Sequence, residues 1–199
     1  MLSEAFGNLL AADYNILESV TNGRDLVDAV KRHKPDLVIA DIAMPLLNGL
    51  EAGRQIKKAL PEVKLIFLTV NEDPDLAAEA FRCGAKGYVL KNCAISELID
   101  AIKAVLCGRS YVTPLISGAI IESINQGPGK SNRFRALTSR QCEVLQLLAE
   151  GHTMKQVAGI LGIKPRTVAF HKYRIMEQHN IKTNAELLRI AAKFNLISL

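Results

Sequence analysis

Short apolar runs alternate along the first half of the chain with stretches in which apolar residues recur every three or four positions. The apolar runs are rich in β-branched and aromatic residues and predict strands over residues 14–20, 37–40, 64–68 and 87–90. The amphipathic stretches between them predict helices over about 24–33, 49–59, 74–83 and 94–106. Strands that alternate with helices predict a parallel sheet with helices on both faces. The runs at 37–40 and 65–68 are continuously apolar, which is typical of strands buried on both faces.

From residue 137 onward the pattern is helical throughout, in four short pieces. Three of these pieces begin with a Thr that is followed three positions later by Gln or Glu, the sequence of a capping box. The pairs are Thr138–Gln141, Thr153–Gln156 and Thr183–Glu186. The second piece ends at Gly162 and the third begins near Pro165, a residue that suits the first turn of a helix. Two short helices joined by a tight turn that contains Gly predict a helix-turn-helix.

The composition is that of a folded soluble chain with one large or two small domains. The chain has 199 residues, of which 49% are hydrophobic and 23% charged, and these values exclude collagen, coiled-coil and wholly disordered proteins. No apolar run reaches the roughly 18 residues of a membrane span, and we expect no secretory signal because the first residues lack a basic segment. The four cysteines include no Cys-x-x-Cys pair, so neither a disulfide framework nor a zinc site is predicted, and a reducing cytoplasm fits.

The charge is distributed unevenly between the two halves. Residues 1–126 carry 13 Lys and Arg against 16 Asp and Glu, whereas residues 127–199 carry 12 against 4, a net charge of +8. The change falls in the polar stretch 126–133, which contains Gly and Pro and is typical of a linker. A small basic domain indicates a polyanionic partner, most often nucleic acid. The charge alone is explained equally well by a solvated basic surface without a partner.

Three polar residues directly follow predicted strands, namely Asp41, Thr69 and Lys91. Ligands of parallel α/β sheets bind beyond the carboxyl ends of the strands, so a carboxylate, a hydroxyl and an ammonium group converge on one rim. A carboxylate can accept a phosphoryl group as a nucleophile, and the other two groups can bind phosphoryl oxygens. Polar residues commonly end strands, but three of them in this order favour a phosphoryl-transfer site.

The residues around this rim form a set of motifs. They are Asp41-Ile42-Ala43-Met44-Pro45, Asn48-Gly49, Thr69 and the run Gly-Ala-Lys-Gly-Tyr-Val-Leu-Lys at 84–91. From about residue 8 to 107 the chain resembles the receiver domain of a bacterial response regulator, which implies a CheY-like, flavodoxin-like parallel sheet. The resemblance implies that Asp41 accepts a phosphoryl group, that Thr69 supplies the switch hydroxyl and that Lys91 binds the phosphoryl group. It also implies that Tyr88 is the switch aromatic residue and that the Ala43 carbonyl, with Asp41, faces Mg²⁺.

The first strand of that family ends in an acidic pair that holds Mg²⁺, and we expect this strand to be missing. The chain is expected to begin inside the following helix, whose apolar stripe is Leu2, Phe6, Leu9 and Leu10. Asp13 imitates the acidic pair, but it directly precedes the predicted strand 14–20 and is interpreted as a loop residue. The absent strand would lie between the segments 14–20 and 36–40, and Mg²⁺ binding is expected to be weak or absent. Either the start is placed too late or the receiver is damaged.

The second half carries its own motifs. They are the run Leu-Thr-Ser-Arg-Gln-Cys-Glu-Val-Leu at 137–145, Gly151, Val157-Ala158, Leu161-Gly162-Ile163, Thr167-Val168 and His171. Over residues 137–194 they resemble the LuxR-type DNA-binding domain. The resemblance implies that the helix at about 165–177 lies in the major groove and that the helix at 184–194 dimerises. The candidate DNA-binding residues are then Arg166, Thr167, Ala169, Phe170, His171, Lys172 and Arg174.

Several residues depart from the pattern of this second family. Lys164 stands where a capping hydroxyl is preferred, so we expect a poorly capped recognition helix. Ala169 occupies a position that is often Lys, which removes a contact in the groove. His179 and Asn180 replace a hydrophobic residue and a Gly, so the end of that helix is expected to fray. For His171, a packed, hydrogen-bonded histidine is favoured over a DNA contact.

Together the chain is similar to a NarL/FixJ-type response regulator. The expected domains are a receiver at 1–108, a linker with a short helix at 109–136, and an all-α four-helix helix-turn-helix domain at 137–199. The resemblance implies a cytoplasmic transcription regulator, not an enzyme, that is controlled by phosphorylation of Asp41. Its expected partners are a sensor histidine kinase, double-stranded DNA and a second copy of the chain, without a membrane.

Two alternative functions remain at this point. An aspartyl-phosphate phosphatase would need a second carboxylate two positions after Asp41, where this chain has Ala43. A DNA-binding regulator whose degenerate receiver is only an interaction module, independent of phosphorylation, is consistent with the missing acidic pair.

Overall fold

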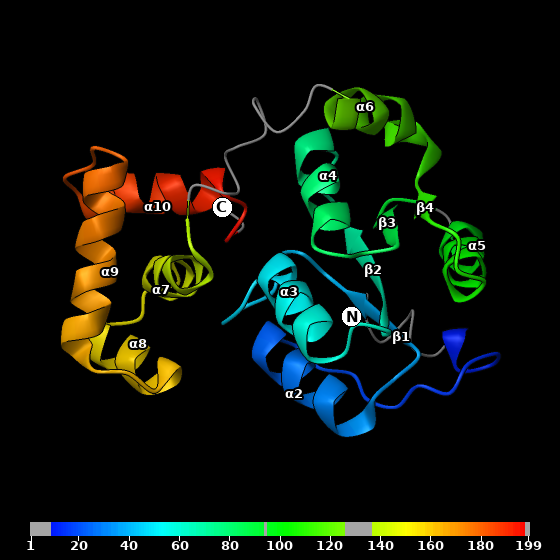
Figure 1. The fold of residues 1–199 in the computed structure, drawn as a ribbon, viewed down its shortest axis with the longest axis horizontal. Coiled ribbons are helices and arrows are strands. Elements are labelled where there is room, and N and C mark those ends of the chain that lie inside the picture. The colour runs from blue at the N-terminus through cyan, green and yellow to red at the C-terminus, as the bar shows by residue number, and fades with distance from the viewer. Residues whose placement is uncertain (1–8, 94, 126–136, 198–199) are drawn as a thin grey trace.

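The first domain is built on a parallel sheet. The computed structural model describes residues 9–93, 95–125 and 137–197. Within them the strands pair in parallel and in chain order (Figure 1). They are β1 (Leu37–Ala40), β2 (Lys64–Thr69), β3 (Gly87–Leu90) and β4 (Tyr111–Val112). A helix connects each strand to the next, so the predicted α/β architecture is confirmed.

Helices cover both faces of the sheet. One face packs against α5 (Ile95–Leu106), where Ile66 and Leu68 of β2 lie. The other face, with Leu65 and Phe67, packs against three further helices. These are α2 (Gly23–His33), α3 (Gly49–Ala59) and α4 (Pro74–Arg82). Because successive side chains of a strand point to opposite faces, the continuous apolar run of β2 supplies both cores at once.

The predicted strand at 14–20 is wrong, because the structure has no strand there. Ile16 and Leu17 are 44% and 46% exposed. Among the described residues β1 pairs with β2 alone, so it lies at the edge of the sheet and alternates between buried and half-buried positions. An extended segment becomes a strand only where a neighbouring ladder satisfies its backbone N–H and C=O groups. No described strand supplies such a ladder to the segment 14–20.

The segment before residue 14 agrees with its interpretation as far as it is described. Leu9 and Leu10 are helical, and Leu10 is buried in the cluster beneath α5, whereas Leu9 is 52% exposed. Asp13 lies in the turn that follows, as expected for a loop residue. Leu2 and Phe6 lie outside the described residues.

Part of the range that was expected to be a linker packs on the receiver. Strand β4 pairs with β3, and α6 (Pro114–Asn125) lies against α4. Ile116 and Ile120 of α6 are buried in the same core as the sheet. The sequence predicts a short helix in this range, and its docking follows from these two apolar residues one helical turn apart.

The second domain consists of helices, as predicted. They are α7 (Ser139–Ala149), α8 (Met154–Leu161), α9 (Pro165–Gln178) and α10 (Asn184–Lys193). All three predicted capping boxes are formed, because each Thr accepts a hydrogen bond from the third backbone N–H and each Gln or Glu reaches back. Gly162 ends α8 in the left-handed conformation, with a φ of 62°, which allows the tight turn into α9.

The end of α9 makes a turn and a ring contact that its sequence does not by itself indicate. Asn180 takes the left-handed conformation, with a φ of 51°, where the family has Gly. Asn tolerates this conformation better than most residues. The ring of His179 packs edge-on against Phe194, with 5.5 Å between the ring centroids. As predicted, Lys164 gives α9 no side-chain cap at its start.

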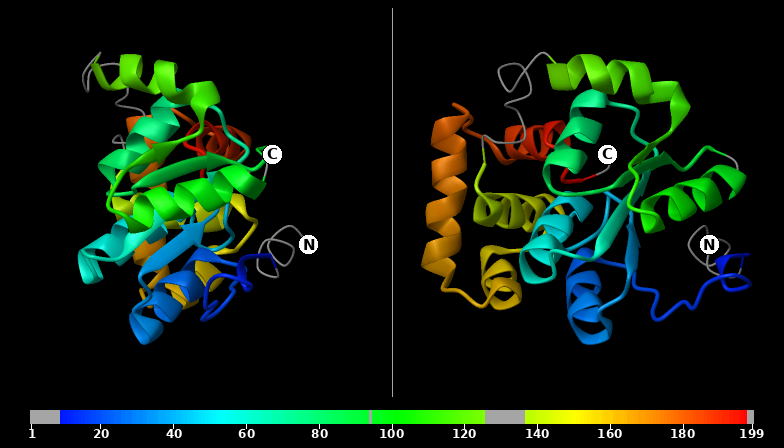
Figure 2. Two further views of the ribbon diagram at one scale, coloured as in Figure 1. Left: turned by 90° about the vertical axis from the view of Figure 1, so that its right-hand side faces the viewer. Right: turned by 45° about the vertical axis from the view of Figure 1, so that its right-hand side comes forward.

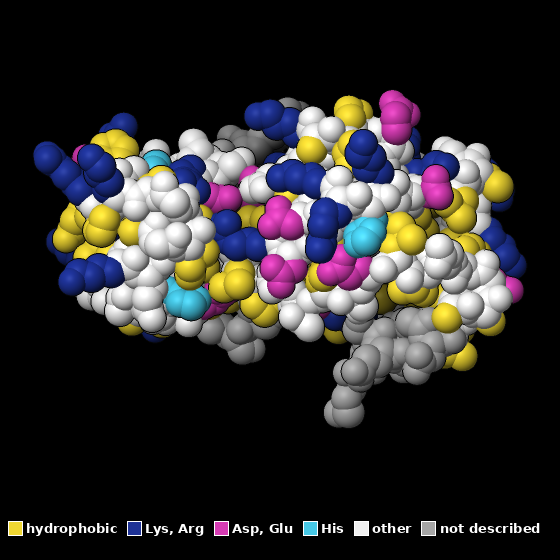
Figure 3. All heavy atoms as spheres, turned by 90° about the horizontal axis from the view of Figure 1, so that it is seen from below, with side chains coloured by type: hydrophobic (Ala, Val, Ile, Leu, Met, Phe, Trp, Pro, Cys, Tyr) yellow, Lys and Arg dark blue, Asp and Glu magenta, His cyan; other side chains and the backbone are white. Residues whose placement is uncertain are grey.

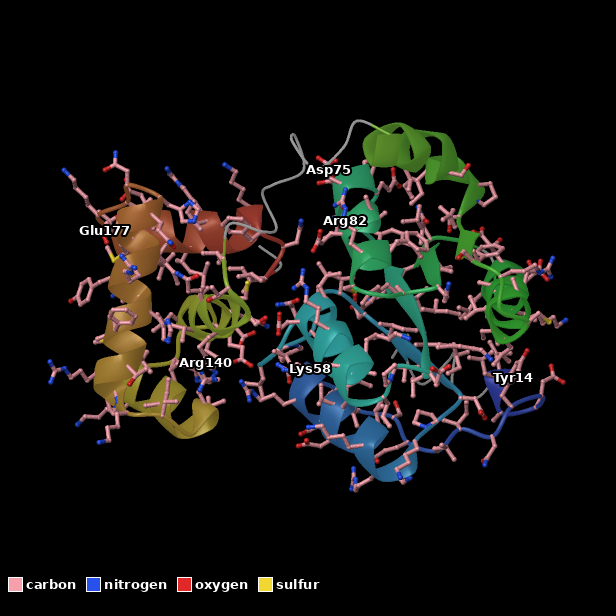
Figure 4. All side chains as sticks on the ribbon, viewed as in Figure 1. Tyr14, Lys58, Asp75, Arg82, Arg140 and Glu177 are labelled. Atoms are coloured by element: carbon pink, nitrogen blue, oxygen red, sulfur yellow. The ribbon has the colours of Figure 1, made fainter. Side chains whose placement is uncertain are left out.

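The two domains contact each other through α7. Figures 1 and 2 show α7 facing α2 and α3, whereas α9 lies at the end of the molecule farthest from the sheet. All side chains from Gln141 to Leu147 are buried, the polar ones included. Figure 4 shows side chains from both domains meeting in this region. Glu143 accepts a hydrogen bond from Gln55 and Gln146 accepts one from the N–H of Asn48, and both cross the boundary.

Candidate functional site

Asp41 and Lys91 form an ion pair at the carboxyl rim of the sheet. Asp41 directly follows β1 and Lys91 directly follows β3, so the parallel arrangement brings both groups to the same edge. The side chains remain 28% and 25% exposed, so a group in solution can reach both of them. The predicted convergence of a carboxylate and an ammonium group is therefore present.

The loop after Asp41 holds the carboxylate in place. The backbone N–H of Ala43 donates to Asp41 Oδ1 over 3.1 Å. Gly49, the first residue of α3, lies directly against the backbone of Asp41, and a Cβ atom there would stand 2.1 Å from the Asp41 carbonyl oxygen. Only Gly allows this approach, which lets the N–H of Gly49 donate to the carbonyl of Ile42.

Thr69 ends β2 at the same rim and is buried, with 2% of its surface exposed. Its carbonyl accepts a hydrogen bond from the N–H of Lys91 over 2.8 Å, which joins the ends of the two strands. Its hydroxyl oxygen accepts a hydrogen bond from the N–H of Asn71 over 3.2 Å. The structure therefore places all three predicted rim residues at one edge of the sheet.

Tyr88 lies in the middle of β3 with its side chain buried in the core. Its hydroxyl donates to the carbonyl oxygen of Asn71 over 2.7 Å. Burial, and secondarily the charge of Asp73, holds the pKa of this hydroxyl well above its usual range. Asn71 thus contacts both Thr69 and Tyr88, a role that the sequence did not indicate because an Asn after a strand is typical of any loop.

The donor set for a metal at this rim is small. No group of three or more His, Cys, Asp or Glu among the described residues could hold a metal ion. One oxygen of Asp41 accepts the Ala43 N–H and the other pairs with Lys91, so its carboxylate is already satisfied. Mg²⁺ prefers oxygen ligands in an octahedron, and these residues do not by themselves form such a site.

The exposed face of α9 is the candidate nucleic-acid interface. Val168 and Ile175 are fully buried and fix the orientation of the helix. Arg166 and Thr167 lie on the exposed side with Phe170, which is 59% exposed, and Arg174. Figure 3 shows Lys and Arg side chains projecting from the end of the molecule that α8 and α9 form.

The exposed residues of α9 also contact one another. The guanidinium of Arg174 lies 5.9 Å from the centre of the Phe170 ring, and its nitrogen lies 3.7 Å from Glu177. Tyr173 is 62% exposed on the same side and was not among the predicted residues, although it follows Phe170 at helical spacing. A pair of exposed aromatic rings beside Arg is unusual on a surface without a partner.

The remaining predicted residues are less available. Lys172 is half-buried and donates to Asn184 Oδ1 of α10 over 3.0 Å. Ala169 is also half-buried. His171 is half-buried beside Phe170, and its pKa is lowered first by burial and then by the charge of Arg140.

Arg140 itself does not point to the exposed face of α9. It pairs with Glu143 at 2.6 Å and donates to the carbonyl of Leu161, so it joins α7 to the end of α8 (Figure 4).

The described helices include none that is long and apolar enough to cross a membrane.

Two sequence families match the two domains. The response regulator receiver domain matches residues 1–103, and the luxR family of bacterial regulatory proteins matches residues 135–191. The chain is 32% identical to the oxygen regulatory protein NreC of Staphylococcus carnosus over 93% of this chain and 88% of that protein. It is 29% identical to the response regulator GacA of Pseudomonas aeruginosa over 88% of this chain and 82% of that protein.

Solved structures share the fold. A LuxR-family two-component response regulator from Aurantimonas is 28% identical, with a TM-score of 0.58 over 61% of this chain and 88% of that chain. RcsB from Salmonella enterica, bound to a promoter in the presence of BeF₃⁻, is 22% identical, with a TM-score of 0.60 over 96% and 92% of the two chains. With its receiver sheet and its helix-turn-helix domain, the chain belongs to the LuxR-type two-component response regulators, which bind DNA.

Proposed function

We propose that Asp41 receives a phosphoryl group from a sensor histidine kinase and that this modification controls DNA binding by the second domain. The observation that carries the proposal is the exposed ion pair between Asp41 and Lys91 at the rim of the sheet. An exposed carboxylate beside a fixed ammonium group can attack phosphorus and hold the product.

In this reaction a carboxylate oxygen of Asp41 forms a bond to phosphorus while the phosphorus–nitrogen bond to the kinase histidine breaks. Lys91, which now neutralises the carboxylate, stays close enough to pair with an oxygen of the transferred group. Thr69 would turn its hydroxyl towards another phosphoryl oxygen. The N–H of Ala43 would keep its hydrogen bond and so orient Asp41.

Magnesium is expected to bind this chain weakly. Asp41 and the carbonyl of Ala43 would be its protein ligands among the described residues, and the carboxylate already has two partners. Labelling of Asp41 by acetyl phosphate should therefore need a high magnesium concentration.

We propose that α9 enters the major groove of double-stranded DNA and that Arg166 and Arg174, both exposed, contact the nucleic acid. Helix α10 would join two copies of the chain on paired half-sites. Such a regulator acts in the cytoplasm, where its DNA lies, and has no enzymatic activity beyond the transfer at Asp41.

A receiver that acts without phosphorylation is less well supported. The family comparisons do not favour it, and the three groups that would serve phosphoryl transfer are all present at the rim.

The test is to incubate the full chain with acetyl phosphate and Mg²⁺ and to locate the label by mass spectrometry. We expect a label on Asp41 that disappears in Asp41→Asn and falls in Lys91→Met. Glu62→Gln, which changes an exposed carboxylate elsewhere on the receiver, should leave the label unchanged. A label that survives Asp41→Asn would contradict the assignment.

A further inference from the structure

Phe170 lies at the centre of the exposed face of α9. Val168 and Ile175 are fully buried, so the opposite side of the helix faces outward. Residues three and four positions apart lie on one face of a helix, so the neighbours of Phe170 on this face are three or four positions before and after it. These neighbours, all exposed, are Arg166, Thr167, Tyr173 and Arg174. The part of α9 that would reach farthest into a major groove is therefore an apolar ring, which is 59% exposed.

Two neighbours on the same helix hold this ring in place. The guanidinium of Arg174 lies 5.9 Å from the ring centroid, and the ring of His171 meets it edge-on, with 5.6 Å between the centroids. Arg174 is itself restrained by Glu177, 3.7 Å away. A side chain that is already restrained loses less conformational freedom when a partner binds, so the ring is suited to a contact of defined geometry.

The centre of this face has no polar side chain that could contact a base edge. Phe170 carries no donor or acceptor, and Ala169 beside it is half-buried and ends at its Cβ atom. The nearest long donors are Arg166 and Arg174, four positions before and after the ring. The face thus has an apolar centre between two cationic groups.

The charge around the ring indicates which partner fits it. Glu177 is the single acidic residue of α9, and residues 127–199 carry a net charge of +8. A second copy of this face would bring like charges together, which repel each other. DNA instead presents phosphates along both edges of its major groove and base edges between them. A ring between two cations therefore matches a major groove better than it matches a second copy of the chain.

We infer that Phe170 is a specificity-determining residue that recognises the C5-methyl group of a thymine. The inference rests on the proposed entry of α9 into the major groove. The thymine methyl is the apolar group that a base pair presents there, whereas the other groups are hydrogen-bond donors and acceptors. A ring gains free energy by burying a methyl group and loses it by covering a donor or acceptor that stays unpaired. The chain should therefore prefer thymine at the base pair that Phe170 contacts.

The test removes the methyl group from the DNA. A duplex is first selected from a library of randomised sequence with the full chain, and each dT is then replaced singly by dU, which pairs identically but lacks the methyl group. Affinities are measured by fluorescence anisotropy at constant salt. We expect a position in each half-site at which dU weakens binding about 4-fold, the effect of burying one such carbon group.

Substitutions at Phe170 assign that position to the ring. Phe170→Ala should bind the dT and dU duplexes equally there, and Phe170→Leu should keep part of the difference because Leu is also apolar. Arg166→Ala is the matched control, since it removes a cation from the same face. It should weaken binding to both duplexes and leave their ratio unchanged. Both side chains are exposed, so each variant should melt like the unmodified chain.

The outcomes separate the inference from the proposed function. If Phe170→Ala keeps the difference between dT and dU, or if no position shows one, the inference is wrong although α9 still binds DNA. A Phe170→Ala variant with an altered oligomeric state and an unaltered ratio would show that the ring meets a second copy, which also overturns the inference. If Arg166→Ala and Arg174→Ala both bind DNA like the unmodified chain, α9 does not enter the groove and the proposed function fails as well.

Discussion

Gly49→Ala should damage the proposed phosphorylation site through a single methyl group. Gly49 is the first residue of α3, where the helical propensity of Ala would ordinarily favour the substitution. The added Cβ would, however, lie 2.1 Å from the carbonyl oxygen of Asp41 and 2.8 Å from the Cα atom of Ile42. Both neighbours are backbone atoms, so neither can rotate away and the loop has to move.

The magnitude follows from these two opposing effects. Overpacking of this kind costs typically 1–3 kcal/mol, and the gain from Ala at a helix end is smaller. We expect a net loss of about 2 kcal/mol in the free energy of unfolding, which lowers the Tm of the receiver by roughly 10 °C. Because the clash is with Asp41 itself, labelling by acetyl phosphate should also fall at temperatures where the variant is folded.

Gly118→Ala is the matched control for this prediction. Gly118 lies inside α6, and a Cβ there meets nothing within 4 Å. The same substitution should therefore stabilise the protein by roughly 0.5–1 kcal/mol. Both variants are measured by thermal unfolding followed by circular dichroism. A Gly49→Ala protein that melts and labels like the unmodified chain would show that the loop around Asp41 is not packed as described.

Three further outcomes are expected. Arg174→Ala should weaken DNA binding and reduce the slope of log affinity against log salt concentration by about 1. Arg109→Ala, outside the second domain, should change neither the affinity nor the slope. Both variants are measured by DNA-binding titration at several salt concentrations. Cys107 is exposed and should react with iodoacetamide in the folded protein at mildly alkaline pH. Burial raises the pKa of the Cys142 thiol to about 12, so Cys142 should react only when the protein unfolds. Because the pKa of Tyr88 is raised in the folded state, its contribution to stability should be constant below the unfolded value of roughly 10 and fall above it. Tyr88→Phe should therefore lose less stability than the unmodified chain between pH 9 and pH 11, roughly one unit either side of that value, in a series of melting curves.

Most elements could be predicted because their patterns are local. The apolar runs of β1 to β3 and the capping boxes of α7, α8 and α10 need only neighbouring residues to be recognised. Segment 14–20 could not be predicted from its local pattern, because residues that favour a strand form one only where a neighbouring strand pairs with them. Strand β4 was missed for the opposite reason, since two residues carry no period and the pairing with β3 defines them.

Some residues of the site could likewise be predicted from local pattern and others could not. Asp41 and Lys91 could be paired from sequence because the ends of parallel strands meet at one rim. Asn71 could not be assigned a role, because its partners Thr69, Tyr88 and Asn195 are brought together only by the complete fold.

The burial of Gln146 could not be predicted from the sequence either. A Gln inside a helix of a small domain is ordinarily an exposed residue, and α7 taken alone would leave it in water. Its complete burial arises from the loop of another domain, 98 residues away along the chain at Asn48. A buried polar side chain is tolerated where its donors and acceptors are satisfied, as all those of Gln146 towards Met44, Asn48 and Glu150 are. If the domains separated, water could satisfy the same groups, so this polar contact would break at little cost.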